Sequence, residues 1–194
     1  MIAGTGGQKV APQGGTEGRF STNPIAFGFP SKTTLVIWDI GTSSVMLGEV
    51  VLKNRLGELL PERLAFAPDG QPTRDADAAL KGAFIVWGGH KGSGLAMVIQ
   101  LLGMMAGQTT NPDFLRGCGF FLIVVNPALL GSAEEFQQRV ADYADSVRAT
   151  RPVKPGEPVR VPFDRSIAER AKRLAANAIE VPDLVYEALR RVAA

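Results

Sequence analysis

Apolar residues fall into short blocks along the chain, with the spacing typical of strands in some blocks and of helices in others. Blocks rich in β-branched and aromatic residues at 25–29 and 33–38 predict two short strands, and the run GFFLIVVN at 119–126 predicts a buried strand. The longer apolar block at 95–106 predicts a buried helix that packs against this last strand. It is shorter than the roughly 20 residues that a membrane-spanning helix needs.

Three further helices are predicted in the second half of the chain. Ser132 has the residue type that caps a helix, and the helix it begins extends to about residue 150. Its apolar stripe, with helical spacing, is interpreted as core and not as a cofactor site: Phe136, Val140, Tyr143, Ala144 and Val147. After a proline-broken linker at 152–162, helices are expected at 166–178 and 182–192.

The remaining segments predict little regular structure. Residues 1–19 are rich in glycine and predict a loose loop, like an interior loop whose preceding structure is missing. Residues 39–44 predict a turn or helix cap, and 45–53 a helix or short strand. Three prolines and the Asp69-Gly70 turn signal predict a mostly irregular surface excursion before the loop at residue 88.

Composition narrows the class of partner. The sequence has 21 basic and 19 acidic residues without a long run of either sign, so neither a nucleic acid nor a membrane surface is indicated, and a small molecule is favoured. A lone Cys118 and no recognisable leader favour the cytoplasm. One histidine and one cysteine argue against a structural zinc site.

The segment GGHKGSGLAM at 88–97 is the clearest candidate for chemistry. Glycines before an apolar helix let backbone N–H groups approach an anion, and Lys91 adds a full positive charge, so a phosphate or carboxylate is the expected ligand. The alternative is a plain turn with a solvated lysine. The segment is not a Walker loop, because Gly92 follows the lysine, and no GxGxxG follows a strand. His90 is either a proton shuttle or a simple hydrogen-bonding residue.

A second basic segment lies between residues 148 and 173. It has eight lysines and arginines against three acidic residues. These cations either clamp a dinucleotide phosphate or form a solvated helix face.

Five ordered segments of the chain resemble the type-2 malate/L-lactate dehydrogenase family, which includes ureidoglycolate and sulfolactate dehydrogenases, diketogulonate reductase and piperideine-carboxylate reductase. They are STNPIAFGFP at 21–30, WDIGTSSVMLGEV at 38–50, LLPERLAFAPDGQPTRDADAAL at 59–80, GGHKGSGLAM at 88–97 and FLIVVNP at 121–127. The resemblance implies a mixed α/β fold, in which a non-Rossmann mixed sheet is flanked by helices. It also implies NAD or NADP as cofactor, hydride transfer to or from a 2-hydroxy, 2-oxo or imino acid, and a homodimer.

The resemblance also assigns site residues. Those at the cofactor are Asp39, Ile40, Gly41, Thr42, Ser43, His90, Lys91, Pro162, Phe163 and Asp164. Phe163 replaces a family glycine and is expected to crowd the backbone. Thr22 and Asn23 match a Thr-Asn pair near the substrate, with Ser21 in place of the preceding glycine.

Two functional residues of the family, its proton-transfer histidine and its carboxylate-binding arginine, have no counterpart in these 194 residues, and His90 does not occupy that histidine's position. We therefore expect a shortened form, with residues 1–150 as the NAD(P)-binding domain and 151–194 as a helical segment that packs on a missing N-terminal domain. It would act beside a complementing N-terminal fragment. The alternatives are a non-catalytic module for dinucleotide binding or dimerisation, and an unrelated α/β protein.

Overall fold

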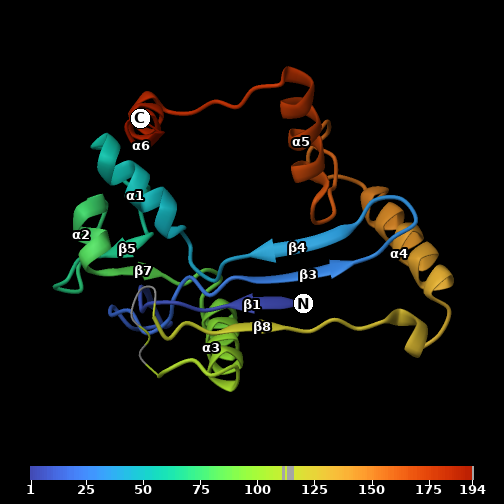
Figure 1. Cartoon of the computed structure of the whole chain (residues 1–194), viewed down its shortest axis with the longest axis horizontal. Coiled ribbons are helices and arrows are strands. Elements are labelled where there is room, and N and C mark those ends of the chain that lie inside the picture. The colour runs from blue at the N-terminus through green and yellow to red at the C-terminus, as the bar shows by residue number, and fades with distance from the viewer. Residues whose placement is uncertain (111, 113–115, 194) are drawn as a thin grey trace. The chain divides into compact units, whose positions relative to one another are not determined.

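The computed structural model describes residues 1–110, 112 and 116–193 and divides into two compact units (Figure 1). Unit 1 comprises Met1–Phe27 and Asp39–Val125, and unit 2 comprises Gly28–Trp38 and Asn126–Ala194. The division between the units therefore does not follow the expected boundary at residue 150. Tertiary contacts instead group residues 28–38, the tip of one hairpin, with the C-terminal helices.

The strands form two four-stranded sheets, which confirms a mixed α/β fold. The first has the order β4-β3-β1-β8, and β1 pairs antiparallel with both of its neighbours. The second has the order β2-β7-β5-β6, in which β2 and β7 are parallel and the other pairs antiparallel. The strand bounds are β1 Ile2–Gly4, β2 Val10–Ala11, β3 Ile25–Phe29, β4 Val36–Ile40, β5 Ala65–Phe66, β6 Pro72–Thr73, β7 Ala83–Ile85 and β8 Phe120–Leu122.

Helices follow the predicted order. Unit 1 contains α1 Leu47–Leu56, α2 Ala76–Lys81 and α3 His90–Met105, and unit 2 contains the 3-10 turn η1 Pro127–Leu129, α4 Ala133–Arg148, α5 Asp164–Ala176 and α6 Asp183–Ala193. The Ser132 side chain accepts a hydrogen bond from the Glu135 N–H, which confirms it as the N-cap of α4. Within the described part of the chain, no helix has the length and apolar character to cross a membrane.

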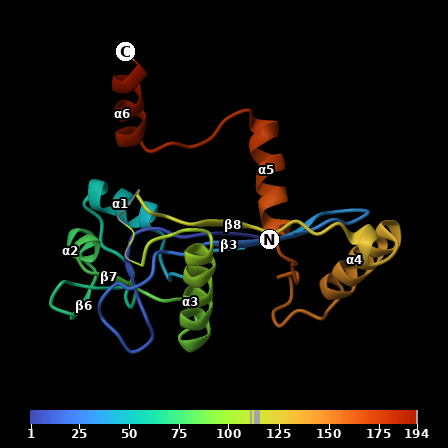
Figure 2. The same ribbon diagram turned by 60° about the horizontal axis from the view of Figure 1, so that its bottom comes forward.

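Unit 1 has two apolar clusters. The first joins the second sheet to α1 and α2 and is centred on Val10, Val50, Leu60 and Phe84, none of which is exposed. The second joins Ala3 of β1, Ile25 of β3 and Ile99 of α3. Accordingly α3 lies beside β1 and β8 in both views (Figures 1 and 2).

Two segments expected to lack structure belong to this core. Residues 1–19 are not a loose loop throughout, because β1 and β2 pair in different sheets and bury Ala3, Val10 and Ala11. The expected surface excursion likewise contributes buried Leu60 and forms the β5–β6 hairpin around the Asp69-Gly70 turn. Both predictions were only partly right, because pairing partners far away in sequence supply burial that local composition does not encode.

Two segments expected to be buried are buried on one side only. The outer side of α3 shows Met97, Val98, Leu101 and Met105, each more than half exposed. The segment at 119–126 contains only the three-residue edge strand β8, in which Phe120 and Leu122 are 65% and 59% exposed. The two elements nevertheless pack together as predicted, since a Cβ on Gly119 would lie 2.6 Å from the Gly103 backbone.

The apolar stripe of α4 is also only partly core. Ala144 is buried, but Tyr143 is 74% exposed. The stripe lines a groove of about 570 Å³ together with Phe29, Val36 and the segment at 160–162, all within unit 2. The helical spacing identified the face of α4 that packs inward, but only part of that face is buried.

Candidate functional site

The bend at 41–43 lies against the end of β7, immediately before the glycine-rich segment that begins α3. Ser43 forms an isolated antiparallel bridge with Val86, and the Trp87 N–H donates to the Thr42 carbonyl at 2.8 Å. On its other side, the Thr42 N–H donates to the Thr22 carbonyl at 2.8 Å. Three predicted segments that are distant in sequence therefore meet in unit 1.

The residues that precede this bend belong to a strand. The predicted strand at 33–38 is shifted to β4, so Asp39 and Ile40 end the strand and do not begin a turn. Asp39 is exposed, whereas Ile40 packs on the apolar cluster around Ile25. A Cβ on Gly41 would lie 3.0 Å from the sulfur of the flexible Met46 side chain and 3.4 Å from the Thr22 carbonyl oxygen, so the bend is tightly packed here.

Two glycines with positive φ, Gly88 at 65° and Gly89 at 59°, turn the chain from β7 into α3. The helix begins at His90, so Lys91 lies in its first turn and not in a loop as predicted. Gly92 packs directly on the Trp87 carbonyl, where a Cβ would overlap that oxygen. This contact fixes where the helix begins relative to the bend at 41–43.

The first turn of α3 has the features of an anion site. Its N-cap Gly89 has no side chain to accept from the first N–H groups, and the turn contains no acidic residue. His90 and Lys91 are both exposed there. Uncapped N–H groups, the positive end of the helix dipole and a lysine together favour a phosphate or carboxylate.

A loop that no sequence motif assigned to the site lies beside the first turn of α3. Residues 11–16, with Phe66, Ile85 and Val86, line a cavity of about 310 Å³. The Gln13 N–H donates to Ser93 Oγ at 3.2 Å and so connects this loop to the first turn of α3. The available signal is the Pro-Gln-Gly-Gly turn at 12–15, which lies inside the glycine-rich segment predicted to be a loose loop.

Asn23, a predicted substrate residue, is completely buried. Its Nδ2 donates to the Ala96 carbonyl at 2.9 Å and to Gln100 Oε1 at 3.0 Å, so it braces the loop at 22–23 against α3. Its Oδ1 is buried and has no partner among the described residues. Gln100, which is also buried, was not recognised from sequence because it interrupts an apolar run without any motif.

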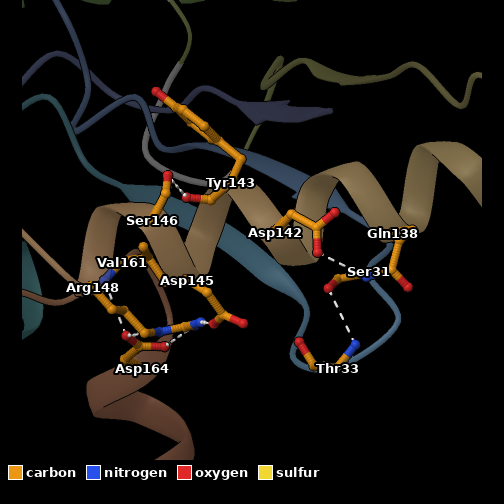
Figure 3. Close-up of polar contacts among 10 residues, drawn as sticks. All are labelled: Ser31, Thr33, Gln138, Asp142, Tyr143, Asp145, Ser146, Arg148, Val161 and Asp164. Carbon is orange, nitrogen blue, oxygen red and sulfur yellow. Dashed lines mark hydrogen bonds and ion pairs between the residues drawn. The ribbon is translucent and has the colours of Figure 1, made fainter.

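The other predicted cofactor residues, Pro162, Phe163 and Asp164, belong to unit 2. Asp164 begins α5 and accepts hydrogen bonds from Arg148 Nε at 3.0 Å and Nη2 at 2.7 Å (Figure 3). It also accepts from the Val161 N–H at 3.0 Å. The Arg148 hydrogen bonds hold the pKa of the Asp164 carboxyl below its usual value, although burial acts in the opposite direction, and the same pair raises the pKa of Arg148.

Replacing Asp164 with asparagine is expected to destabilise unit 2 by about 1 to 3 kcal/mol, since it removes a bidentate, partly buried ion pair. The folded carboxyl has a lower pKa than the unfolded one, so its contribution is fully present above the unfolded value near 3.8 and is lost as the pH falls through the folded value. Urea unfolding at pH 7 and pH 3 measures both effects. An Asp164→Asn penalty that persists undiminished at acidic pH would contradict the assignment.

Phe163 has φ of 83°, in the left-handed region that favours glycine. A side chain at this φ strains the backbone of Phe163. The strain results from the sharp entry into α5, where the Asp164 N–H donates back to the Val161 carbonyl at 3.2 Å.

We expect Phe163→Gly to be more stable than Phe163→Ala by about 1 kcal/mol. Both variants remove the ring, but only glycine relieves the left-handed strain. Thermal unfolding of the pair isolates the backbone effect from the loss of ring packing. Equal melting temperatures would show that the backbone relaxes without cost.

The basic segment at 148–173 is only partly available for a phosphate. Arg148 is committed to Asp145 and Asp164, and Arg173 pairs with Glu169 at 2.9 Å. Arg165 and Arg170 border an open hollow of about 820 Å³ beside α5. The solvated-face interpretation therefore holds for part of the segment.

Comparison with known proteins adds the evolutionary context. A family model described as malate/L-lactate dehydrogenase matches residues 1–190. The Delta(1)-pyrroline-2-carboxylate reductase of Ancylobacter novellus is 40% identical over 192 residues, which cover 93% of this chain and 55% of that protein. The L-sulfolactate dehydrogenase of Methanothermobacter thermautotrophicus is 32% identical, covering 95% and 54%.

Solved structures agree with the sequence matches. A dehydrogenase from Sinorhizobium meliloti superposes with a TM-score of 0.92 at 33% identity, covering 100% of this chain and 58% of the other. Sulfolactate dehydrogenase from Methanocaldococcus jannaschii gives a TM-score of 0.80 at 28% identity, covering 98% and 57%. The chain thus spans about half the length of the relatives it matches.

Proposed function

Because the chain belongs to the malate/L-lactate dehydrogenase family, we propose that it forms the NAD(P)-binding part of an oxidoreductase acting on a small 2-hydroxy, 2-oxo or cyclic imino acid. We further propose that it acts in the cytoplasm, within a homodimer or with a complementing N-terminal fragment. The names of its relatives, pyrroline-carboxylate reductases and sulfolactate dehydrogenases, support a small carboxylic acid as the substrate class.

One observation carries this proposal: the bend at 41–43 packs on residues 85–87, directly before the uncapped first turn of α3. The first turn of α3 fits the phosphates of a dinucleotide, since its backbone N–H groups and Lys91 place positive charge at one point of unit 1. When bound, the nicotinamide supplies the hydride chemistry.

The chain's own residues would bind and orient the cofactor. Lys91 and the N–H groups of the first turn of α3 hold the pyrophosphate. Residues 39–43 border the cofactor, and their backbone bonds to Thr22 and Trp87 fix their position. Pro162, Phe163 and Asp164, the cofactor residues assigned by resemblance, belong to unit 2, where the Arg148 ion pair holds the start of α5 in place.

On the substrate side, Thr22 contacts the acid, and Asn23 positions the loop through α3. Reduction of a carbonyl or imine also needs a proton donor within hydrogen-bond reach. We assign this role to the complementing fragment, because His90, the only histidine here, belongs to the cofactor segment. Loss of such a group typically lowers rates about 10²- to 10⁴-fold.

A second candidate is a non-catalytic dinucleotide-binding or dimerisation module. The two candidates differ in turnover but share cofactor binding.

Titration with NADH and NADPH tests cofactor binding, which both candidates share. Trp87 lies directly before the glycine turn, so binding is expected to quench its emission and give energy transfer to the nicotinamide. Turnover is then followed by cofactor absorbance with pyruvate, oxaloacetate or a cyclic imino acid, with and without co-expressed N-terminal residues of the Ancylobacter reductase. Activity only in the mixture supports a split enzyme, and binding without activity in either sample supports the module. If neither NADH nor NADPH binds, both candidates are contradicted. Activity of the chain alone refutes the assignment of the proton donor.

A further inference from the structure

Two buried amide side chains connect the loop at 22–23 to the middle of α3. Asn23 is completely buried, and Gln100 is 6% exposed. The Asn23 Nδ2 donates to Gln100 Oε1 at 3.0 Å and to the Ala96 carbonyl at 2.9 Å. Ala96 and Gln100 are one helical turn apart and lie on the same face of α3. Asn23 is therefore held at two points of the helix, while its neighbour Thr22 remains partly exposed.

The backbone of the same loop is held by a second segment. Thr42, which is completely buried, donates to the Thr22 carbonyl through its N–H at 2.8 Å and through its Oγ1 at 3.1 Å. The same hydroxyl lies 3.4 Å from the Asn23 carbonyl. The bend at 41–43 thus fixes the carbonyl groups of the loop, and α3 fixes the Asn23 side chain.

Asn23 does not adopt this conformation without cost. Its φ of 34° lies in the left-handed region, and its Oδ1 is buried without a partner in the described part of the chain. Apolar side chains of similar size would fill the same space without an unpaired polar atom. A buried polar pair, in contrast, specifies one arrangement of its neighbours. Strain in a loop that is held at so many points indicates a functional constraint on that loop.

We propose that Gln100 is a positioning residue for the small carboxylic acid: its Oε1 holds Asn23, which in turn fixes where Thr22 meets the acid. The inference rests on the proposed function, in which Thr22 contacts the substrate. Gln100 lies on the same helix as Lys91, roughly 14 Å further along the axis. One helix therefore carries the proposed cofactor site at its first turn and holds the substrate loop from its middle, which fixes the distance between the two subsites.

Gln100→Leu tests this role, since leucine favours a helix but cannot accept the Asn23 hydrogen bond. Calorimetry measures binding of pyruvate, oxaloacetate or a cyclic imino acid with NAD⁺ or NADP⁺ present, because an oxidised cofactor cannot transfer a hydride to these acids. We expect wild type to bind at least one of them, and Gln100→Leu to bind it about tenfold more weakly. NADH affinity should stay within about twofold, since the first turn of α3 is unchanged.

Two control variants separate positioning from a loss of stability. Gln108→Leu also removes a buried amide, whose Oε1 accepts a hydrogen bond from Thr5, and it should keep the affinity for the acid within about twofold. Gln100→Glu keeps an acceptor for Asn23 and should retain most of the affinity. Equal weakening by Gln100→Leu and Gln108→Leu overturns the proposal, as does a wild type that binds NADH but none of the acids.

Asn23→Gly removes the same hydrogen bond from its other partner and relieves the positive φ. It should weaken binding of the acid as much as Gln100→Leu does. The double variant should bind no more weakly than Asn23→Gly alone, because both substitutions remove one interaction. Additive losses would show that Gln100 acts by another route.

Hydrogen exchange tests the connection without any ligand. The Thr42 amide donates to the Thr22 carbonyl, so in Gln100→Leu its exchange rate relative to that of the Phe84 amide should rise about tenfold. The Phe84 reference corrects for a loss of global stability, and Gln108→Leu should leave the ratio unchanged. An unchanged ratio in Gln100→Leu overturns the positioning role whether or not a ligand binds. Failure of wild type to bind NADH and NADPH contradicts the proposed function instead.

Discussion

Replacing Lys91 with alanine is expected to weaken binding of NADH and NADPH by between roughly tenfold and a hundredfold. A hydrogen bond from a charged donor contributes about 1.5 to 3 kcal/mol, and tenfold in affinity corresponds to about 1.4 kcal/mol. The side chain lies in the uncapped first turn of α3, where no acidic residue competes for the charge. The loss should therefore appear in affinity without a change in folding.

Tryptophan emission during cofactor titration measures this loss. Lys81→Ala is the matched control, because Lys81 is also exposed but pairs with Asp77 at 2.5 Å on α2. Lys91→Arg keeps the charge and should retain most of the affinity. Superimposable titration curves for wild type and Lys91→Ala would remove the lysine from the cofactor site.

Gly92→Ala is expected to destabilise unit 1 by about 3 kcal/mol and to abolish cofactor binding. A Cβ at this position would overlap the Trp87 carbonyl, and backbone cannot move aside as a flexible side chain can. The first turn of α3 would have to shift away from the bend at 41–43, which separates the elements of the proposed site. Chemical denaturation and cofactor titration together report both losses.

Gly94→Ala provides a control two residues along the same helix. A Cβ on Gly94 meets nothing within 4 Å, so the substitution should stabilise the helix by up to about 1 kcal/mol through intrinsic propensity. Cofactor affinity should be retained. Equal stability of the two variants would show that the Gly92–Trp87 contact does not constrain the helix.

Local signals predicted α3, α4, α5 and α6 well, but not α2, which lies in the segment expected to be irregular. Ser132 caps α4 as expected, and the glycines at 88 and 89 mark the start of α3 within two residues. Capping and positive φ depend on nearest neighbours, so residue type alone identifies them. The predicted strand at 33–38 was displaced toward the bend, because its register is set by pairing with β3 and not by its own composition.

The candidate site was predictable only in part. Lys91 and the segment at 39–43 were identified from residue type and resemblance, but their common location depends on the Ser43–Val86 bridge. The loop at 11–16 and Gln100 gave no usable signal. A buried amide in an apolar helix has meaning only when its partner, Asn23, is known to lie opposite.

The sequence by itself determined that α3, α4, α5 and α6 are helices, and where α3 and α4 begin. It also determined that a cationic turn without acidic residues exists at 88–92, since these properties depend on residues close together in the chain. The tertiary structure decided which apolar segments are covered. It placed β1 and β2 of the glycine-rich start into two sheets and left β8 and the outer side of α3 exposed. Burial depends on partners distant in sequence, and a run of apolar residues does not record whether its partner belongs to the same polypeptide.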